Sequence, residues 1–340
     1  VAFDVMEGRE HGNFSAWGRA SADQQRHLQE EILEEVSEGE MPLGRYLWLH
    51  PEAKVAPSDL ETLRKWVNGA NGPTQKADAR ADPPPPVPPG VTRLSGTPEE
   101  IGREHGTRLA GKIRIMLGEY LKEDFNSGKL DEVARARVQA MRPSLPEWYL
   151  RELAACAKAA GVDEDALLYA QCEGDIKSLG GCTTYAAFGE ALGGGRIEIG
   201  RNFDYWGLES TGSCAAVFAI LPAKGDGHAF VSVGWTGILG GWTFYNEKGL
   251  FVANNLGGFG KKNPKGVPTL ILERMIAQQA ATVDEAIAIV RKTPRMRGQA
   301  LVIAQAGDPG SGVPPDAAVV LYDAEKVEVK RAENGWAFHT

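Results

Sequence analysis

Apolar residues recur at helical spacing in the first part of the chain. Between residues 21 and 39 they fall every three or four positions, as on one face of a helix. A second short helix is predicted over residues 58–69, opened by a capping box of Ser58 and Glu61. The first 69 residues are therefore predicted to form a small all-α module.

The longest helical region begins near residue 97. Thr97 and Glu100 form a second predicted capping box, and Pro98 occupies the first turn. Helical spacing then continues to about residue 160, where Gly161 is a predicted C-cap. These features predict a run of helices before any strand.

The pattern changes to strand-like runs beyond residue 180. "GRIEIGRNFDYW", "AAVFAILPA" and "HAFVSVGWTGIL" are predicted strands, and the segment NEKG at 246–249 suits a hairpin turn. Helices are predicted over about 269–280 and 282–293, before strands return in "QALVIAQAG", "DAAVVLYD" and "KVEVKRA". Runs of strands flanked by runs of helices favour an α+β layered sandwich over a doubly wound parallel sheet.

A proline-rich stretch divides the chain. Residues 68–90, "NGANGPTQKADARADPPPPVPPG", show no apolar periodicity and are typical of an extended linker. We expect a small module over 1–69, a linker over 70–92 and a larger domain over 93–340. A module of this size has a marginal core, so it usually needs a cofactor or a partner surface.

Composition excludes several classes of function. The formal net charge is −8 and no basic stripe is present, which argues against a nucleic-acid partner. No run of 18 apolar residues occurs, so no membrane span is predicted. The four cysteines have no CxxC spacing, so neither a zinc cluster nor another metal site is expected.

Cys182 has the surroundings of a nucleophile. A nucleophilic cysteine needs a thiolate, a proton acceptor and donors for an oxyanion, and no histidine lies in a recognisable protease signature. Its own α-amino group, freed by cleavage after Gly181, is another acceptor, because a reference pKa of about 7.7 to 8.0 suits a base near neutral pH. Arg201 would favour the thiolate and Asp204 would bind the new amine. The structural alternative is a buried cysteine beside a turn, with a plain Arg201–Asp204 ion pair.

Three motifs in order, "GGCTTYAAFG", "GRNFDYW" and "NEKGLFVANN", resemble the N-terminal nucleophile (Ntn) hydrolases. The specific resemblance is to the cysteine family of acyl-coenzyme A:6-aminopenicillanic acid acyltransferase (isopenicillin N acyltransferase), over about residues 91–340. It implies a four-layer αββα sandwich and autocatalytic cleavage between Gly181 and Cys182. The pro-segment would be 93–181 and the catalytic part 182–340.

The same resemblance assigns site residues. Cys182 corresponds to the nucleophile, and Arg201 and Asp204 to its charged partners. Asn255, or its neighbour Asn254, matches the position that lends a backbone amide to the oxyanion hole. In the family a strand like "GWAFHT" is followed by an asparagine that supplies a second oxyanion donor, so the catalytic part is expected to be incomplete at its C-terminus. The hydrolase chemistry itself needs no metal or organic cofactor.

The N-terminal module resembles the haem-binding domain of bacterial c-type cytochrome proteins, over residues 1 to about 69. Met41 in "GEMP" matches a haem-ligand position, with a packing residue as the alternative. The chain contains no CxxCH, so haem is expected only if an upstream segment carries that motif. Because c-type haem is assembled outside the cytoplasm, the resemblance implies a periplasmic or otherwise exported protein, with a cytoplasmic location as the alternative.

Together these features predict an autoprocessed cysteine amidohydrolase or acyltransferase that acts on a linear amide through an acyl-thioester on Cys182. The substrate class is a small acyl amide, and the sequence leaves the acyl group, the amine and the oligomeric state open. The alternative is a haem-linked electron-transfer or sensing protein whose Ntn-like domain binds ligands without catalysis. A third reading is a degenerate, uncleaved relative that only binds acyl ligands.

Overall fold

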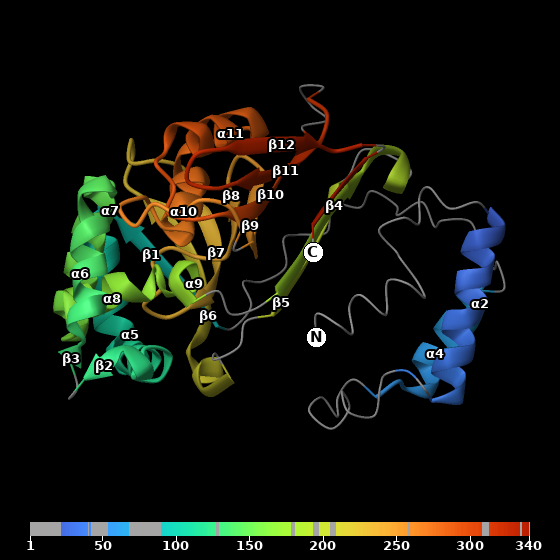
Figure 1. Ribbon diagram of the computed structural model, residues 1–340, viewed down its shortest axis with the longest axis horizontal. Helices are drawn as coiled ribbons and strands as arrows, with labels where there is room; N and C mark the ends of the chain where they lie inside the picture. The colour runs from blue at the N-terminus through green and yellow to red at the C-terminus, as the bar shows by residue number, and fades with distance from the viewer. Residues whose placement is uncertain are drawn as a thin grey trace. The chain divides into compact units, whose positions relative to one another are not determined.

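The computed structural model divides into two compact units, Val1–Pro85 and Pro86–Thr340, and the division lies within the predicted linker (Figure 1). The structure describes residues 22–39, 41, 54–67, 90–126, 129–177, 181–192, 197–204, 209–257, 259–307, 313–333 and 335–339.

The described residues of the first unit form two helices in contact, α2 (Ala22–Glu38) and α4 (Pro57–Val67). Both helices were predicted from the sequence and are confirmed. The capping box predicted at Ser58 is wrong, because Ser58 already lies in the first turn of α4. The carboxylate of Asp59 instead accepts the Ala56 N–H at 3.1 Å, just before the helix.

The helices of the second unit begin and end at capping residues. Thr97 accepts the N–H of Glu100, whose carboxylate accepts the N–H of Thr97, so the predicted capping box is confirmed. Gly161 ends α7 in the left-handed conformation at φ 67°, as predicted. The α-helices are α5 (Pro98–Tyr120), α6 (Glu132–Met141), α7 (Glu147–Ala160), α8 (Glu164–Ala170), α9 (Glu173–Lys177), α10 (Thr269–Gln279) and α11 (Val283–Lys292).

An eight-stranded sheet lies at the centre of the second unit, in the order β1-β6-β7-β8-β9-β10-β11-β12. All neighbours are antiparallel except β1, which runs parallel to β6. The predicted hairpin joins β8 to β9, with Gly249 at φ 74° and its N–H bonded to Asn246 O at 2.9 Å. The strands are β1 (Val91–Gly96), β6 (Ala215–Pro222), β7 (Phe230–Trp235), β8 (Thr243–Asn246), β9 (Leu250–Leu256), β10 (Gln299–Gln305), β11 (Asp316–Tyr322) and β12 (Val327–Arg331).

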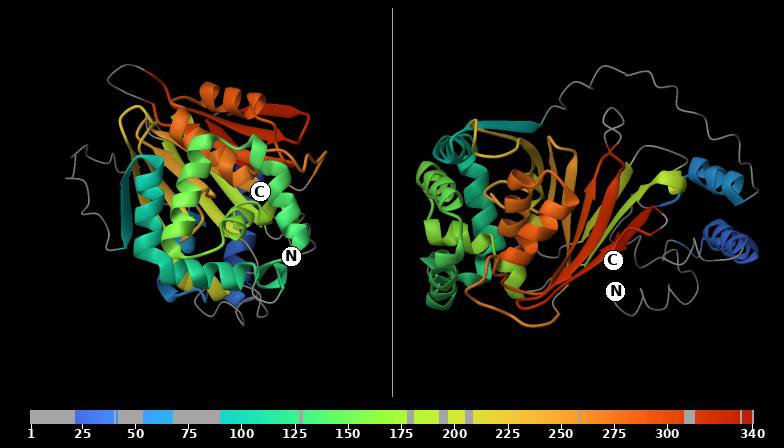
Figure 2. Two further views of the ribbon diagram at one scale, coloured as in Figure 1. Left: turned by 90° about the vertical axis from the view of Figure 1, so that its left-hand side faces the viewer. Right: turned by 90° about the horizontal axis from the view of Figure 1, so that it is seen from above.

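A second sheet has three strands in the order β13-β4-β5. Figure 2 shows the resulting layers in its right-hand view: helices, the large sheet, then the small sheet. The α+β class is confirmed, and the described residues supply three of the four layers of the αββα sandwich. The remaining strands are β4 (Gly181–Phe188), β5 (Ile197–Asp204), β13 (Trp336–His339) and the short pair β2 (Phe125–Asn126) and β3 (Lys129–Leu130).

Two apolar cores fill the spaces between the layers. Strand β9 shows the alternation that separates them, because Val252 packs into the core under the helices while Phe251 and Ala253 pack between the sheets. Small residues such as Ala186 on β4 and Ala304 on β10 share the core between the sheets. Their size lets the sheets approach closely, which brings the start of β4 to the end of β9.

Residues on both sides of the predicted cleavage bond build the larger core. Strand β1 completes the large sheet beside β6. Glu152 on α7 forms a buried ion pair with Arg274 on α10, at 2.8 Å. Gln171 donates to Gly237 O at 2.9 Å and accepts the Gly240 N–H at 3.0 Å. The predicted pro-segment is therefore structurally part of the domain.

His105 makes the stability of this core depend on pH. It is 3% exposed, and its Nε2 accepts the Gly237 N–H at 3.1 Å. Burial, and then the charge of Arg274, lower the pKa of His105 from 6.5 to about 4. Its protonation therefore favours the unfolded chain. The stability it contributes is complete above pH 6.5 and is lost as the pH falls toward 4, by about 3 kcal/mol in all.

Urea unfolding of the wild type and His105→Gln between about pH 7 and pH 4 measures this effect. In the variant, the free energy of unfolding should change less steeply with pH, by about 1.4 kcal/mol per pH unit, because the contribution of His105 is gone. Parallel slopes in the two proteins would contradict the assignment.

Candidate active site

Cys182 lies near the start of β4, on the face of the small sheet that turns toward the large sheet. Strand side chains alternate between faces, so Cys182, Thr184 and Ala186 share that face. The register pairs Cys182 with Phe203 and Thr184 with Arg201, which puts Arg201 on the same face of the neighbouring strand. Cys182 is only 6% exposed. The pleat of two adjacent strands thus brings the two motifs together.

The guanidinium of Arg201 is held beside the sulfur of Cys182. Its Nη2 lies 3.9 Å from Cys182 Sγ. Its Nε donates to Thr243 Oγ1 at 2.7 Å, and its Nη1 donates to Asn254 O at 2.8 Å and to Thr184 Oγ1 at 3.2 Å. These hydrogen bonds fix the positive charge of Arg201 beside the sulfur.

The two candidate asparagines have different surroundings. Asn255 is fully buried, and its Nδ2 donates to Cys182 O at 2.9 Å while its Oδ1 accepts from Thr184 Oγ1 at 2.7 Å. Asn254 lines the cavity in front of Cys182, and its buried Oδ1 has no hydrogen-bond partner among the described residues. Asn255 therefore positions the nucleophile's backbone, while the side-chain amide of Asn254 faces the space in which a substrate would react.

Asp204 lies on the opposite face of the small sheet. Its carboxylate is exposed and accepts from Asn202 Nδ2 at 2.9 Å. Its backbone pairs with Gly181, the residue before the nucleophile. The predicted contact between Asp204 and a freed amine of Cys182 stays a prediction.

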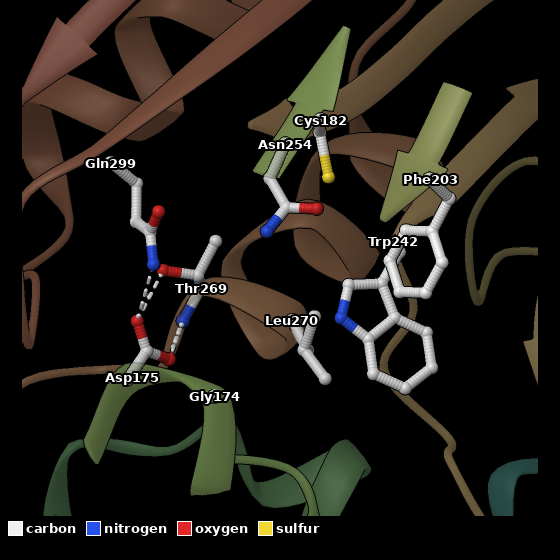
Figure 3. A pocket seen from close by; sticks show the side chains of 9 residues that line it. All are labelled: Gly174, Asp175, Cys182, Phe203, Trp242, Asn254, Thr269, Leu270 and Gln299. Carbon is white, nitrogen blue, oxygen red and sulfur yellow. Dashed lines mark hydrogen bonds between the residues drawn. The ribbon is translucent and has the colours of Figure 1, made fainter. Parts of the chain in front are cut away.

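The cavity in front of Cys182 is small, about 10 Å³, which is the room for one water molecule. Phe203 and Trp242 form one wall, with ring centroids 5.3 Å apart. Figure 3 shows the sulfur and the Asn254 amide pointing into the same space. The aromatic rings lie on one side of that space, and Asp175 with its hydrogen-bond partners lies on the other. The lining residues are Gly174, Asp175, Cys182, Phe203, Trp242, Asn254, Thr269, Leu270 and Gln299.

Asp175 is a site residue that sequence reasoning missed. Its carboxylate accepts from the backbone N–H and hydroxyl of Thr269, at 2.8 and 2.7 Å, and from Gln299 Nε2 at 3.3 Å. Burial raises the pKa of Asp175, and the hydrogen bonds from Thr269 oppose that rise. Asp175 belongs to the predicted pro-segment and Thr269 starts α10, so this contact fixes α9 against the far wall of the cavity. No local motif marks the pair.

Glu273 is a second missed residue, on the face of α10 one turn after Thr269. It is fully buried, and neither carboxyl oxygen has a hydrogen-bond partner among the described residues. Burial raises the pKa of Glu273 well above its ordinary value, although the charge of Arg201 opposes the rise. In the described part of the chain no carboxylate forms an ion pair with Arg201, so its charge remains available to Cys182.

Met41 follows α2, and its side chain is 46% exposed. No described residue of α4 is buried. The exposure of Met41 argues against the packing role that was the alternative. Residues 1–21 and 42–53 lie outside the described part of this module, so Met41 as a haem ligand stays a prediction.

Metal and membrane features are absent from the described residues. No group of three or more His, Cys, Asp or Glu side chains could hold a metal ion there. No helix among them has the length and apolar character needed to cross a bilayer.

The fold and the cysteine site together define an α+β domain with a buried cysteine and an arginine side by side at a strand start. Residues 192–310 match the family model described as acyl-coenzyme A:6-aminopenicillanic acid acyl-transferase. Residues 1–69 match the family model described as a haem-binding domain. Both resemblances drawn from the sequence are thereby confirmed.

An uncharacterized protein of Archaeoglobus fulgidus is 25% identical over 273 residues. The match covers 71% of this chain and 44% of that protein, so the chain spans less than half of its relative's length. Among solved structures, the Caenorhabditis elegans orthologue of N-acylethanolamine-hydrolyzing acid amidase matches at 16% identity and a TM-score of 0.37, over 47% of this chain and 69% of that one. Penicillin V acylase from Agrobacterium tumefaciens matches at 18% identity and a TM-score of 0.30, over 44% of this chain and 50% of that one.

Proposed function

We propose that this chain is an autoprocessed cysteine amidohydrolase or acyltransferase of the Ntn type, with Cys182 as nucleophile. The observation that carries the proposal is the guanidinium of Arg201, 3.9 Å from the sulfur, anchored by three oxygen acceptors and paired with no carboxylate in the described part of the chain. Such a charge stabilises a thiolate, and a structural cysteine has no need of it.

In the first reaction, the Cys182 thiolate attacks the carbonyl carbon of Gly181. The C–S bond forms, the Gly181–Cys182 C–N bond breaks, and the Cys182 nitrogen takes up the thiol proton as a free amine. Water then hydrolyses the thioester, which leaves a carboxylate on Gly181 and a free thiol on Cys182. Gly181 is exposed and carries no side chain that hinders this attack.

In the second reaction, the freed α-amine of Cys182 is the general base. It takes the thiol proton as sulfur attacks an amide carbonyl, and it gives that proton to the departing amine. Asn254 is the proposed side-chain donor to the oxyanion, and Asp204 would bind the ammonium. Water, or an acceptor amine, then releases the acyl group from the thioester.

The cavity in front of Cys182 is too small for a substrate. Room for one water admits no acyl chain, and Asp175 of the predicted pro-segment forms part of its wall. We infer that the end of the pro-segment withdraws from the site after cleavage, which opens the aromatic wall of Phe203 and Trp242 to an apolar acyl group.

Acyl-thioester trapping tests this function. Cleaved protein is mixed with a p-nitrophenyl acyl ester, quenched in acid and digested, and the peptide that starts at Cys182 should carry the mass of one acyl group. Cys182→Ala should carry none. Acylation confined to other residues, or none on cleaved wild-type protein, would rule the function out.

The match to a haem-binding domain supports a second proposal, export from the cytoplasm as part of a longer haem protein. An absorbance scan of the full-length gene product for a Soret band tests it. Full-length protein without that band, after expression with haem supplied, would leave the amidohydrolase as the sole function proposed here.

A further inference from the structure

Two threonines follow Cys182, and the chemistry proposed above uses neither. Their side chains lie on opposite faces of β4, because strand side chains alternate. Thr183 is partly exposed on the outer face of the small sheet, whereas Thr184 is fully buried on the inner face. Thr184 contacts both Arg201 and Asn255.

The direction of each hydrogen bond around Thr184 is fixed by chemistry. A guanidinium only donates, so Thr184 Oγ1 must accept from Arg201 Nη1, at 3.2 Å. The one hydroxyl proton of Thr184 then goes to Asn255 Oδ1, at 2.7 Å. This sets the orientation of the Asn255 amide and leaves its Nδ2 to donate to Cys182 O, at 2.9 Å.

We propose that Thr184 is a positioning residue, through a one-way hydrogen-bond chain from Arg201 to Thr184 to Asn255 to the carbonyl of Cys182. The chain ties the guanidinium and the backbone of the nucleophile to one hydroxyl. It keeps Arg201 Nη2 beside the sulfur and prevents rotation of the Asn255 amide. The inference goes beyond the proposed function, because it concerns how the thiol is held and not which amide is cleaved.

Loss of the hydroxyl removes two links at once. A valine at position 184 fills the same volume but neither accepts from Arg201 nor donates to Asn255. The buried Oδ1 of Asn255 then loses the Thr184 hydroxyl as a donor, so the position of the amide that donates to Cys182 O is less well defined. Arg201 keeps only its bonds to Thr243 and Asn254 O, and its position beside the sulfur becomes less well defined.

The test measures the rate at which hydrogen peroxide, a reagent small enough for this cavity, oxidises the Cys182 sulfur to the sulfenic acid at pH 7, read by mass spectrometry of the peptide that contains it. Thr184→Val should slow this oxidation about tenfold, the effect of one buried hydrogen bond. Thr184→Ser keeps the hydroxyl and should restore most of the rate. Thr183→Val, with the same change on the outer face, should react like the wild type.

Oxidation by hydrogen peroxide needs neither self-cleavage nor a substrate, so its result is separate from the fate of the proposed function. Equal rates in folded Thr184→Val and wild type would overturn the positioning role, and so would a Cys182 that does not react in the wild type. If circular dichroism shows that Thr184→Val does not fold, Thr184→Ala is compared with Thr184→Ser in the same way. Where cleaved enzyme turns over an amide, Thr184→Val should lower kcat with little change in KM.

Discussion

Replacing Cys182 with alanine is expected to leave every purified chain intact, whereas wild-type protein should separate into fragments 1–181 and 182–340 in denaturing mass spectrometry. The effect is all-or-none, because the sulfur is the atom that attacks the Gly181 carbonyl and alanine offers no substitute. The guanidinium of Arg201 lies 3.9 Å from that sulfur.

Two further variants sharpen this experiment. Cys214→Ala removes another fully buried cysteine, one whose Sγ donates to Lys112 O at 3.4 Å, and should cleave like the wild type. Cys182→Ser should cleave slowly, since a hydroxyl is a weaker nucleophile than a thiolate near neutral pH. Cleavage of the Cys182→Ala variant at the same bond would point to an external protease, and a wild type that stays uncut would refute self-processing.

Arg274→Ala is expected to lower the free energy of unfolding by about 3–5 kcal/mol, because it leaves a buried carboxylate without its counter-charge. The side chains of Arg274 and Glu152 are only 2% and 3% exposed. Arg274 also donates to Leu239 O at 2.7 Å and lies 4.6 Å above the ring of Phe230. Urea unfolding of uncleaved protein, in the Cys182→Ala background, measures the loss.

The pH dependence of this loss has a definite sign. Burial raises the pKa of Glu152 and Arg274 lowers it. Without Arg274 the folded chain holds a proton on Glu152 that the unfolded chain releases, so the loss should grow as the pH rises. Arg108→Ala removes an exposed pair with Glu104 and should cost about 1 kcal/mol or less. An Arg274→Ala cost as small as that of Arg108→Ala would contradict the buried-pair assignment.

Local signals predicted much of the fold. The capping box at Thr97, the C-cap at Gly161 and the hairpin at 246–249 each depend on residues a few positions apart, and each is confirmed. The capping box predicted at Ser58 was wrong, because α4 begins at Pro57 and the carboxylate of Asp59 accepts the N–H of Ala56 just before the helix. The meeting of Cys182 with Arg201 follows from two motifs that form adjacent strands.

The rest of the site depends on contacts that a linear pattern does not encode. Asp175 and Thr269 are 94 positions apart, and only the packing of α9 against α10 joins them. The motif "VANN" could not separate Asn254 from Asn255, because the choice depends on which face of β9 turns toward the small sheet. Glu273 gave no signal at all, since a glutamate within a helix is ordinarily solvated.

The parallel pairing of β1 with β6 affects how the protein could refold after the proposed cleavage. Those strands lie on opposite sides of the proposed cut, so the uncut chain assembles its sheet in a unimolecular reaction. Once the bond is cut, the same sheet joins two polypeptides, and reassembly after denaturation depends on their concentration. The stability of the cut protein would then be kinetic, set by a slow rate of unfolding. Folding as a single chain would be possible only before cleavage.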